Sequence, residues 1–254
     1  MENGIILTIV TINLNNKDGL QKTIDSIISQ TYKNYEWIVI DGGSTDGSKE
    51  LIETYNNYIN YWVSEKDYGI YDAMNKGIRA SRGEYLLFLN SGDKLYDRKV
   101  INEIIQHLYL KESDFLIGKE YHCRKYWDRK IDDYYDLIET CYNYWFPHQS
   151  TFINREMFHR YGLYDTNYII SDWIFFFKAL ILGNASIKRL NVIISVYEND
   201  GTAKYSICQE ERQKYLSEMP RIKELLIFYL KHYKRIEWIK KFFSKKIIKI
   251  FMKY

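Results

Sequence analysis

The sequence has few cysteines and no long apolar run, and each scarcity excludes a class of protein. Three cysteines without a CxxC spacing argue against a disulfide framework or a zinc site and are typical of reduced cytosolic thiols. No run of ~18 apolar residues is present, so no membrane-spanning helix is expected. Residues 1–4 lack the charge and cleavage site of a secretory signal. Hydrophobic residues at 46% exclude intrinsic disorder. We therefore expect a cytoplasmic globular protein.

The nearly balanced charge hides an asymmetry along the chain. The sequence carries 36 Lys and Arg against 33 Asp and Glu. Residues 231–254 contain nine Lys or Arg and one acid, Glu237, which gives this segment a charge of +8 and leaves −5 of the overall +3 to residues 1–230. A basic tail on a mildly acidic body favours an anionic surface as a partner.

Strand and helix patterns alternate through the first half of the chain. Strands are predicted at 5–12, 35–40, 61–64 and 84–89, and helices near 20–28 and at 44–57, 70–80 and 100–108. This alternation predicts βαβ units and a mainly parallel sheet. Ligands of such sheets bind outside the carboxyl ends of the strands. Polar clusters at 13–18, 41–47 and 90–93 follow three of the predicted strands.

The second half of the chain has a less regular pattern. We expect strands at 115–118 and within 185–196, and helices at 155–161, 172–182 and 209–219, whereas 149–153 is apolar with an outer polar edge. Pro220, one of only two prolines, ends the last helix. It divides the chain into a globular domain, 1–219, and a tail, 220–254.

Three acidic residues at predicted strand or helix ends are candidates for chemistry. Asp41 leaves a buried strand and could accept hydrogen bonds from a base or a ribose, although Asp41 to Asp46 also reads as a turn with a helix cap. Asp93 could bind Mg²⁺ or Mn²⁺ through oxygen, or could belong to a simple turn. Asp172 begins an aromatic helix and is either a general base or a helix cap. His148 alone is more typical of a structural role.

Four segments together resemble the family 2 glycosyltransferases of GT-A fold. They occur in the family's order over roughly residues 5–200: Thr8 to Asn13; Val39 to Ser48; Tyr71 to Ile78 with Arg82 to Asp93; and His148-Gln149-Ser150 with Ser171-Asp172-Trp173. The resemblance implies a GT-A (Rossmann-like) sheet flanked by helices, a UDP- or TDP-sugar donor, a divalent cation on the diphosphate, and inversion at the anomeric carbon.

The resemblance also implies roles for individual residues. Asp172 would be the base that deprotonates the acceptor hydroxyl, and Asp93 would bind the metal. The donor-binding residues would be Thr11, Asn13, Asp41, Gly43, Asp72, Asn75, Ser91 and Gly92. The donor or acceptor pocket would include His148, Gln149 and Trp173. The acceptor would be a glycan or a lipid-linked molecule, as in surface-polysaccharide assembly, and no nucleic acid is expected.

The sequence departs from the family pattern at three positions. The family's Asp-Asp pair is Asp41-Gly42 here, and the metal motif keeps one acid, Asp93. Met74 occupies the position of an arginine that faces the phosphates in many relatives, with Lys66 and Lys76 as candidate replacements. These departures imply weaker metal binding or a greater dependence on the diphosphate. They keep a non-catalytic nucleotide-sugar-binding subunit open as an alternative. A sugar nucleotidyltransferase would need a Gly-rich basic loop after the first strand, which is lacking.

Apolar residues of the tail follow a helical stripe. Ile236, Ile239, Phe243, Ile247 and Ile250 recur in steps of three and four, with lysines between them. This pattern predicts a basic amphipathic helix that binds the inner face of the cell membrane and brings the domain to a lipid-linked acceptor. The alternative is a helix that packs on its own domain or on a partner subunit.

Overall fold

The computed structural model describes residues 4–122, 125–127, 146–197 and 205–218. The chain divides into two compact units, Met1–Gly201 and Thr202–Tyr254. Of the second unit, only helix α8 (Tyr205–Glu218) is described, so the predicted tail 220–254 lies outside the described residues. Within the described part of the chain, no helix is both long enough and apolar enough to cross a bilayer.

The first half of the chain forms a parallel sheet with crossover helices, as the alternating pattern predicts. Strands β3, β2, β1 and β4 are neighbours in that order, and all three pairings are parallel. The elements are β1 (Leu7–Asn13), α1 (Lys17–Ile28), β2 (Glu36–Asp41), α2 (Ser48–Thr54), η1 (Asn56–Tyr58), β3 (Tyr61–Ser64), α3 (Ile70–Ala80) and β4 (Tyr85–Phe88).

The second half extends the same sheet with mixed strand directions. Strand β8 pairs antiparallel with β4 and β6, β9 is parallel to β6, and β5 is antiparallel to β9. The sheet is therefore parallel in its first half and mixed in its second. The elements are β5 (Lys94–Leu95), α4 (Val100–Tyr109), β6 (Phe115–His122), β7 (Lys125–Trp127), η2 (His148–Ser150), β8 (Thr151–Asn154), α6 (Glu156–Tyr161), α7 (Ser171–Phe176), η3 (Phe177–Leu182) and β9 (Ile187–Tyr197).

Two predicted helices differ from the observed ones. The helix expected at 44–57 is reduced to α2 and η1, because Gly47 has a φ of +89° and Asp46 accepts hydrogen bonds from the backbone of Lys17 and Ser48. These contacts keep residues before Ser48 in a loop. The helix expected at 172–182 begins as α7 and widens into the π-helical segment η3.

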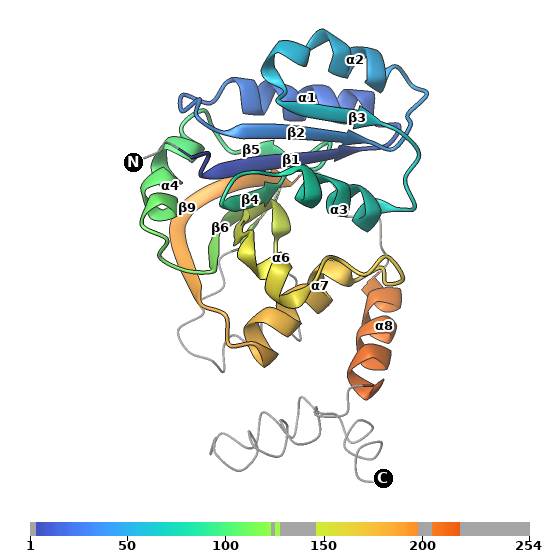
Figure 1. Cartoon of the computed structure of the whole chain (residues 1–254), viewed down its shortest axis with the longest axis vertical. Helices are drawn as coiled ribbons and strands as arrows, with labels where there is room; N and C mark the ends of the chain where they lie inside the picture. The colour runs from blue at the N-terminus through green and yellow to red at the C-terminus, as the bar shows by residue number, and fades with distance from the viewer. Residues whose placement is uncertain (1–3, 123–124, 128–145, 198–204, 219–254) are drawn as a thin grey trace. The chain divides into compact units, whose positions relative to one another are not determined.

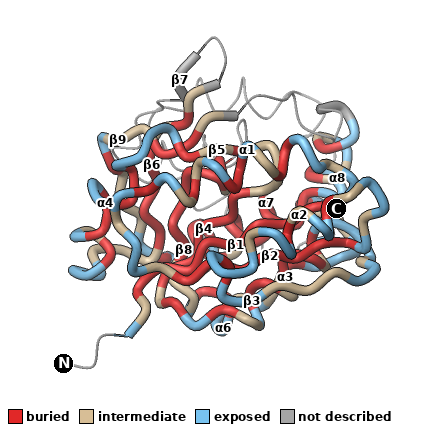
Figure 2. The backbone as a smooth tube through the Cα atoms, turned by 90° about the horizontal axis from the view of Figure 1, so that it is seen from above, coloured by how far each residue is buried: buried red, intermediate tan, exposed pale blue. Residues whose placement is uncertain are grey.

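Helices cover both faces of the sheet (Figure 1). One face buries aliphatic residues of β1, β2 and β4 against α1, α2 and α4. The other face packs on α3, and aromatic side chains of α6 and α7 contact Phe88 of β4 and Phe115 of β6. The central strands β1, β2 and β4 are buried along their length, whereas exposed positions lie on the edge strand β3 and on the surrounding helices and loops (Figure 2). This packing fixes the strand ends, from which the polar clusters project.

Candidate functional site

The ends of three parallel strands form the first part of the site. Asn13 of β1 is in register with Asp41 of β2, and Asp41 is in register with Ser64 of β3. The fully buried Asp41 carboxylate accepts hydrogen bonds from Asn13 Nδ2 (2.8 Å), Ser44 Oγ (2.6 Å), the Ser44 backbone N–H (2.9 Å) and Ser64 Oγ (2.6 Å). The predicted strand-end cluster is therefore one hydrogen-bonded unit.

Electrostatics keep Asp41 ionised within this unit. Burial raises its pKa, but the hydrogen bonds from Ser44, Ser64 and Asn13 outweigh burial and hold the pKa below its ordinary value. Because the carboxylate already has partners, its predicted contact with a base or ribose stays a prediction. Asn13 Oδ1, by contrast, is buried without a hydrogen-bond partner among the described residues, so it has acceptor capacity left for a ligand.

The loop after β4 is held by helix α1. Thr23 Oγ1 donates to the backbone oxygen of Asp93 (2.7 Å) and accepts from the Gly92 N–H (3.0 Å). The side chain of Asn16, the N-cap of α1, donates to the backbone oxygen of Ser91 (3.0 Å). Gly92 has a φ of +105°, a conformation that favours glycine. Asn16 lies in the predicted polar cluster 13–18, but Thr23 was not singled out from the sequence, because nothing in its local pattern points to residues 69 and 70 positions away.

Asp93 is buried within this loop. Its side chain accepts from the Asn90 N–H (3.1 Å), and only 7% of the residue is exposed. Burial raises the pKa of Asp93 to about 6, although the charge of His148 acts in the opposite direction. A cation bound to the carboxylate would offset this desolvation.

Asp172, at the start of α7, is held by three donors. Its Oδ1 accepts from the Tyr71 hydroxyl (2.7 Å) and the Trp173 N–H (2.8 Å), and its Oδ2 lies 3.4 Å from Nδ1 of His148. Burial raises the pKa of Asp172, but the contacts with His148, Tyr71 and Trp173 outweigh burial and lower it below the ordinary value. The carboxylate is therefore ionised at neutral pH. Tyr71 lies in a segment that carries the family resemblance, but the sequence did not single it out.

His148 connects Asp172 with the loop after β4. Its Nε2 lies 3.2 Å from the side-chain nitrogen of Asn90, three residues before Asp93. The structure therefore brings the predicted base and the predicted metal ligand to one histidine. Glu120 of β6, which the sequence did not indicate, also faces this group; burial raises its pKa to about 7, and a hydrogen bond with Gln149 partly opposes the rise.

Five other predicted site residues contact neighbouring residues of the protein. Thr11 accepts from the Trp37 indole (3.1 Å), and the Asn75 amide exchanges two hydrogen bonds with the backbone of Tyr164. Asp72 lies 3.6 Å from Lys76, and the ring of Trp173 stacks on Phe177. Gly43 has a φ of +79° and lies against the backbone of Lys66. The predicted roles of these residues in ligand binding stay predictions.

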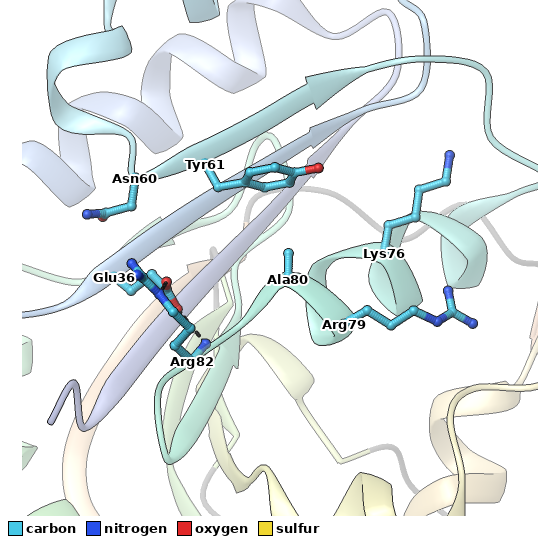
Figure 3. A pocket seen from close by; sticks show the side chains of 7 residues that line it. All are labelled: Glu36, Asn60, Tyr61, Lys76, Arg79, Ala80 and Arg82. Atoms are coloured by element: carbon cyan, nitrogen blue, oxygen red, sulfur yellow. Dashed lines mark hydrogen bonds and ion pairs between the residues drawn. The ribbon is translucent and has the colours of Figure 1, made fainter.

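A separate pocket lies by the amino-terminal ends of β2 and β3 (Figure 3). Its volume is about 560 Å³, and two of its lining residues, Arg82 and Glu36, form an ion pair (2.6 Å). The lining residues are Glu36, Asn60, Tyr61, Lys76, Arg79, Ala80 and Arg82. Among them only Lys76 was given a role from the sequence, as a candidate replacement for the phosphate-facing arginine. The pocket is separate from Asp41 and Ser64, which lie at the carboxyl ends of the same two strands.

The described residues include no group of three His, Cys, Asp or Glu that could hold a metal ion. Of the predicted metal motif, only Asp93 could supply a carboxylate ligand for Mg²⁺ or Mn²⁺. One of its oxygens accepts a hydrogen bond from the Asn90 N–H, which leaves the other oxygen for the cation. Mg²⁺ keeps several waters and binds through one or two carboxylates plus substrate phosphates. The donor set therefore fits a cation that arrives with a diphosphate, rather than a resident metal.

Comparisons with known proteins identify the family of the chain. The model of glycosyl transferase family 2 matches residues 8–180. A PGL/p-HBAD biosynthesis glycosyltransferase of Mycobacterium bovis (strain BCG / Pasteur 1173P2) is 25% identical over 229 residues, 89% of each chain.

Two solved structures share the fold. S. aureus TarS matches with a TM-score of 0.67 at 16% identity, over 95% of this chain and 44% of TarS, and has also been solved as residues 1–349 with UDP-GlcNAc. Mannosyltransferase PcManGT from Pyrobaculum calidifontis, solved with GDP-Man and Mn²⁺, matches with a TM-score of 0.58 at 14% identity, over 90% of this chain and 65% of PcManGT. Since the family model covers more than half of the sequence and the sheet is that of GT-A enzymes, this chain belongs to glycosyl transferase family 2.

Proposed function

We propose that the chain is an inverting glycosyltransferase that moves a sugar from a nucleotide-diphosphate sugar to an acceptor hydroxyl. The observation that carries the proposal is the meeting of Asp172 and the Asn90–Asp93 loop at His148. Single displacement needs a base on one face of the sugar and a stabilised leaving group on the other. An ionised carboxylate and a cation-binding loop on two sides of one histidine supply both.

The proposed chemistry begins at Asp172. The acceptor O–H gives its proton to the carboxylate, and the acceptor oxygen attacks the anomeric carbon. The bond from that carbon to the diphosphate oxygen breaks, and its electron pair leaves with the diphosphate. Oδ2 is the oxygen with capacity left for the proton, because Oδ1 already accepts from Tyr71 and Trp173.

The donor would lie along the strand ends and the loop after β4. Asn13 Oδ1 could accept the N3–H of uracil or thymine, which supports a UDP- or TDP-sugar. Asp93 would hold a divalent cation, which supplies positive charge to the departing diphosphate when bound. The UDP-GlcNAc complex of TarS and the GDP-Man and Mn²⁺ complex of PcManGT support this class of donor and cation.

The acceptor side is proposed from the relatives and the tail. A relative named for PGL/p-HBAD biosynthesis supports a glycan or lipid-linked acceptor. We propose that the basic tail holds the protein on the cytoplasmic face of the membrane, where such an acceptor would be presented.

Asp172→Asn tests the base assignment. Asparagine keeps the size of the side chain but accepts no proton, so kcat should fall by roughly 10²–10⁴-fold. UDP with Mn²⁺ should still raise the melting temperature, since ligand binding stabilises the folded state by mass action. Asp165→Asn, an exposed residue of the preceding segment, is the matched control and should keep wild-type turnover.

The same measurements separate the proposal from its alternative. Wild-type turnover in Asp172→Asn would show that another group accepts the proton. Tight UDP-sugar binding by the wild type without any transfer or hydrolysis would favour the non-catalytic binding subunit, which the single carboxylate at the metal position keeps open.

A further inference from the structure

His148 lies between the two halves of the candidate site. Its Nδ1 lies 3.4 Å from Asp172 Oδ2, and its Nε2 lies 3.2 Å from Asn90 Nδ2. The side chain is 21% exposed, and it is carried by the short helix η2, which precedes β8 at the centre of the sheet. Both ring nitrogens thus face protein groups: Nδ1 faces the proposed base, and Nε2 faces the loop that carries the proposed metal ligand.

The buried amide oxygen of Asn90 favours one direction for these contacts. Within the described part of the chain, Asn90 Oδ1 is buried without a hydrogen-bond partner, while the Asn90 nitrogen faces the imidazole. The oxygen and nitrogen of an amide are assigned from the hydrogen-bond network. Turning the amide by 180° places Oδ1 against Nε2 and satisfies the buried acceptor. His148 then donates from both nitrogens, to Asn90 on one side and to Asp172 on the other.

The surrounding charges favour a ring that donates twice. Burial alone lowers the pKa of His148, but Asp172 of α7, Asp93 after β4 and Glu120 of β6 together raise it above its ordinary value. A histidine with both nitrogens protonated is a donor at both positions and an acceptor at neither.

We propose that His148 is a positioning residue. It contacts both Asp172 and the Asn90–Asp93 loop and so holds Asp172 Oδ2 at a fixed distance from that loop. This inference rests on the proposed function. It assigns His148 no contact with the reacting atoms, because both ring nitrogens are engaged by the protein. Its effect is to fix the separation of two groups that must act on opposite faces of one sugar. A misplacement of about 1 Å in such a pair can cost roughly 10²-fold in rate.

Two amide substitutions separate the two contacts of the ring. The amide nitrogen of asparagine reaches the position of Nδ1, so His148→Asn can still donate to Asp172. The longer glutamine reaches the position of Nε2, so His148→Gln can still bond to Asn90 but not to Asp172. Because each substitution breaks one of the two contacts, we expect kcat to fall by roughly 10²-fold in both variants. UDP affinity should stay that of the wild type in both, which also shows that both variants are folded.

The pH dependence of kcat distinguishes a positioning role of His148 from a merely structural one. His148 is one of the donors that lower the pKa of Asp172. The acid limb of the kcat profile should therefore move to higher pH in His148→Gln and stay close to the wild type in His148→Asn. His107→Gln is the matched control. His107 lies on α4, outside the candidate site, and its Nδ1 also contacts a carboxylate, that of Glu112 (2.6 Å). It should keep the wild-type rate and profile.

A wild-type kcat in either amide variant would overturn the positioning role. A readout without catalysis keeps this failure distinct from a failure of the proposed function. In nitrogen-15 NMR of histidine-labelled protein, Asp172→Asn should change the Nδ1 signal of His148, and Asn90→Ser should change the Nε2 signal. Unchanged signals would refute the two contacts of His148 with Asp172 and Asn90, even if the wild type transfers no sugar.

Discussion

Three aspartates at ends of strands or helices differ in the number of donors that the fold gives them. Asp41 accepts four hydrogen bonds, Asp172 accepts two and faces a histidine, and Asp93 accepts one. The pKa is lowered for the first two and raised to about 6 for Asp93. The carboxylate with the fewest protein partners is the one expected to bind a cation, since a buried charge needs a partner.

A fourth carboxylate, Glu36, stabilises the opposite end of the sheet. Its side chain is 2% exposed and accepts from Thr8 Oγ1 (2.7 Å), the Arg82 N–H (2.7 Å) and Arg82 Nε (2.6 Å). Burial raises the pKa of Glu36, but these donors outweigh burial and lower it. Glu36→Gln removes the charge and should cost roughly 1–3 kcal/mol at pH 7.

The pH dependence of this loss has a defined sign. A carboxylate whose pKa is lowered by folding stabilises the protein above the pKa of the unfolded chain, and this stabilisation is lost as the pH falls through the folded value. The difference in melting temperature between the wild type and Glu36→Gln should therefore shrink below about pH 4. Glu53→Gln, at an exposed pair with Lys49 (4.0 Å), is the control and should change little at any pH. A constant difference down to pH 3 would contradict the role of the charge.

At the scale of elements, α1 fixes the loop that carries Asp93. Thr23 lies on the buried face of α1 and contacts Gly92 and Asp93 through one hydroxyl. The loop conformation thus depends on a helix that is distant in sequence. Loss of this hydroxyl should loosen the loop without unfolding the sheet.

Thr23→Val tests this dependence, because valine keeps the shape of the side chain and removes the hydroxyl. The Gly92 N–H and the Asp93 carbonyl lose a partner, which should cost roughly 1–3 kcal/mol of stability. We also expect weaker binding of UDP with Mn²⁺, measured by calorimetry, and an unchanged far-UV spectrum. Thr54→Val removes an exposed hydroxyl that bonds within α2 and should affect neither quantity. Wild-type UDP and Mn²⁺ affinity in Thr23→Val would show that α1 does not set the loop.

Local patterns in the sequence predict elements better than they predict partners. The spacing of apolar residues predicts β3 and α3 at their observed bounds. It does not predict that His148 meets Asn90 and Asp172, because these contacts join segments 58 and 24 residues apart. Glu120 also escaped prediction, since the pattern becomes irregular after residue 118. Partners of this kind follow from the strand order, which a single sequence does not encode locally.

At the scale of the whole molecule, the two ends of the sheet have different characters. The carboxyl ends carry the site, and the amino ends of β2 and β3 carry the pocket that includes Glu36 and Arg82. The division follows from the parallel arrangement, which places every crossover loop that follows a strand at one end. Sugar transfer is therefore expected at the carboxyl ends of the strands only. The basic tail is expected to decide whether the protein acts at a membrane surface.

The tail gives the whole molecule a predicted affinity for anionic membranes. Each Lys or Arg near an anionic leaflet contributes about 1 kcal/mol, so changing four tail lysines to glutamine should cost roughly 4 kcal/mol, about a thousandfold in binding. The variant is Lys240, Lys241, Lys245 and Lys246 to Gln in the full chain. The control changes four exposed lysines of the first unit to glutamine: Lys33, Lys49, Lys99 and Lys111.

Sedimentation with vesicles of phosphatidylcholine and phosphatidylserine measures the difference between the two variants. The wild type and the control should bind these vesicles equally well and should not bind vesicles of pure phosphatidylcholine. Both should dissociate from the vesicles as the salt concentration rises, because salt screens exposed charges. The tail variant should stay in the supernatant. Equal loss of binding in the tail variant and the control would place the tail against protein instead, since a lysine-rich segment that packs on its own domain or on a partner subunit leaves the net charge of the chain, which both variants lower by the same amount, to set the attraction.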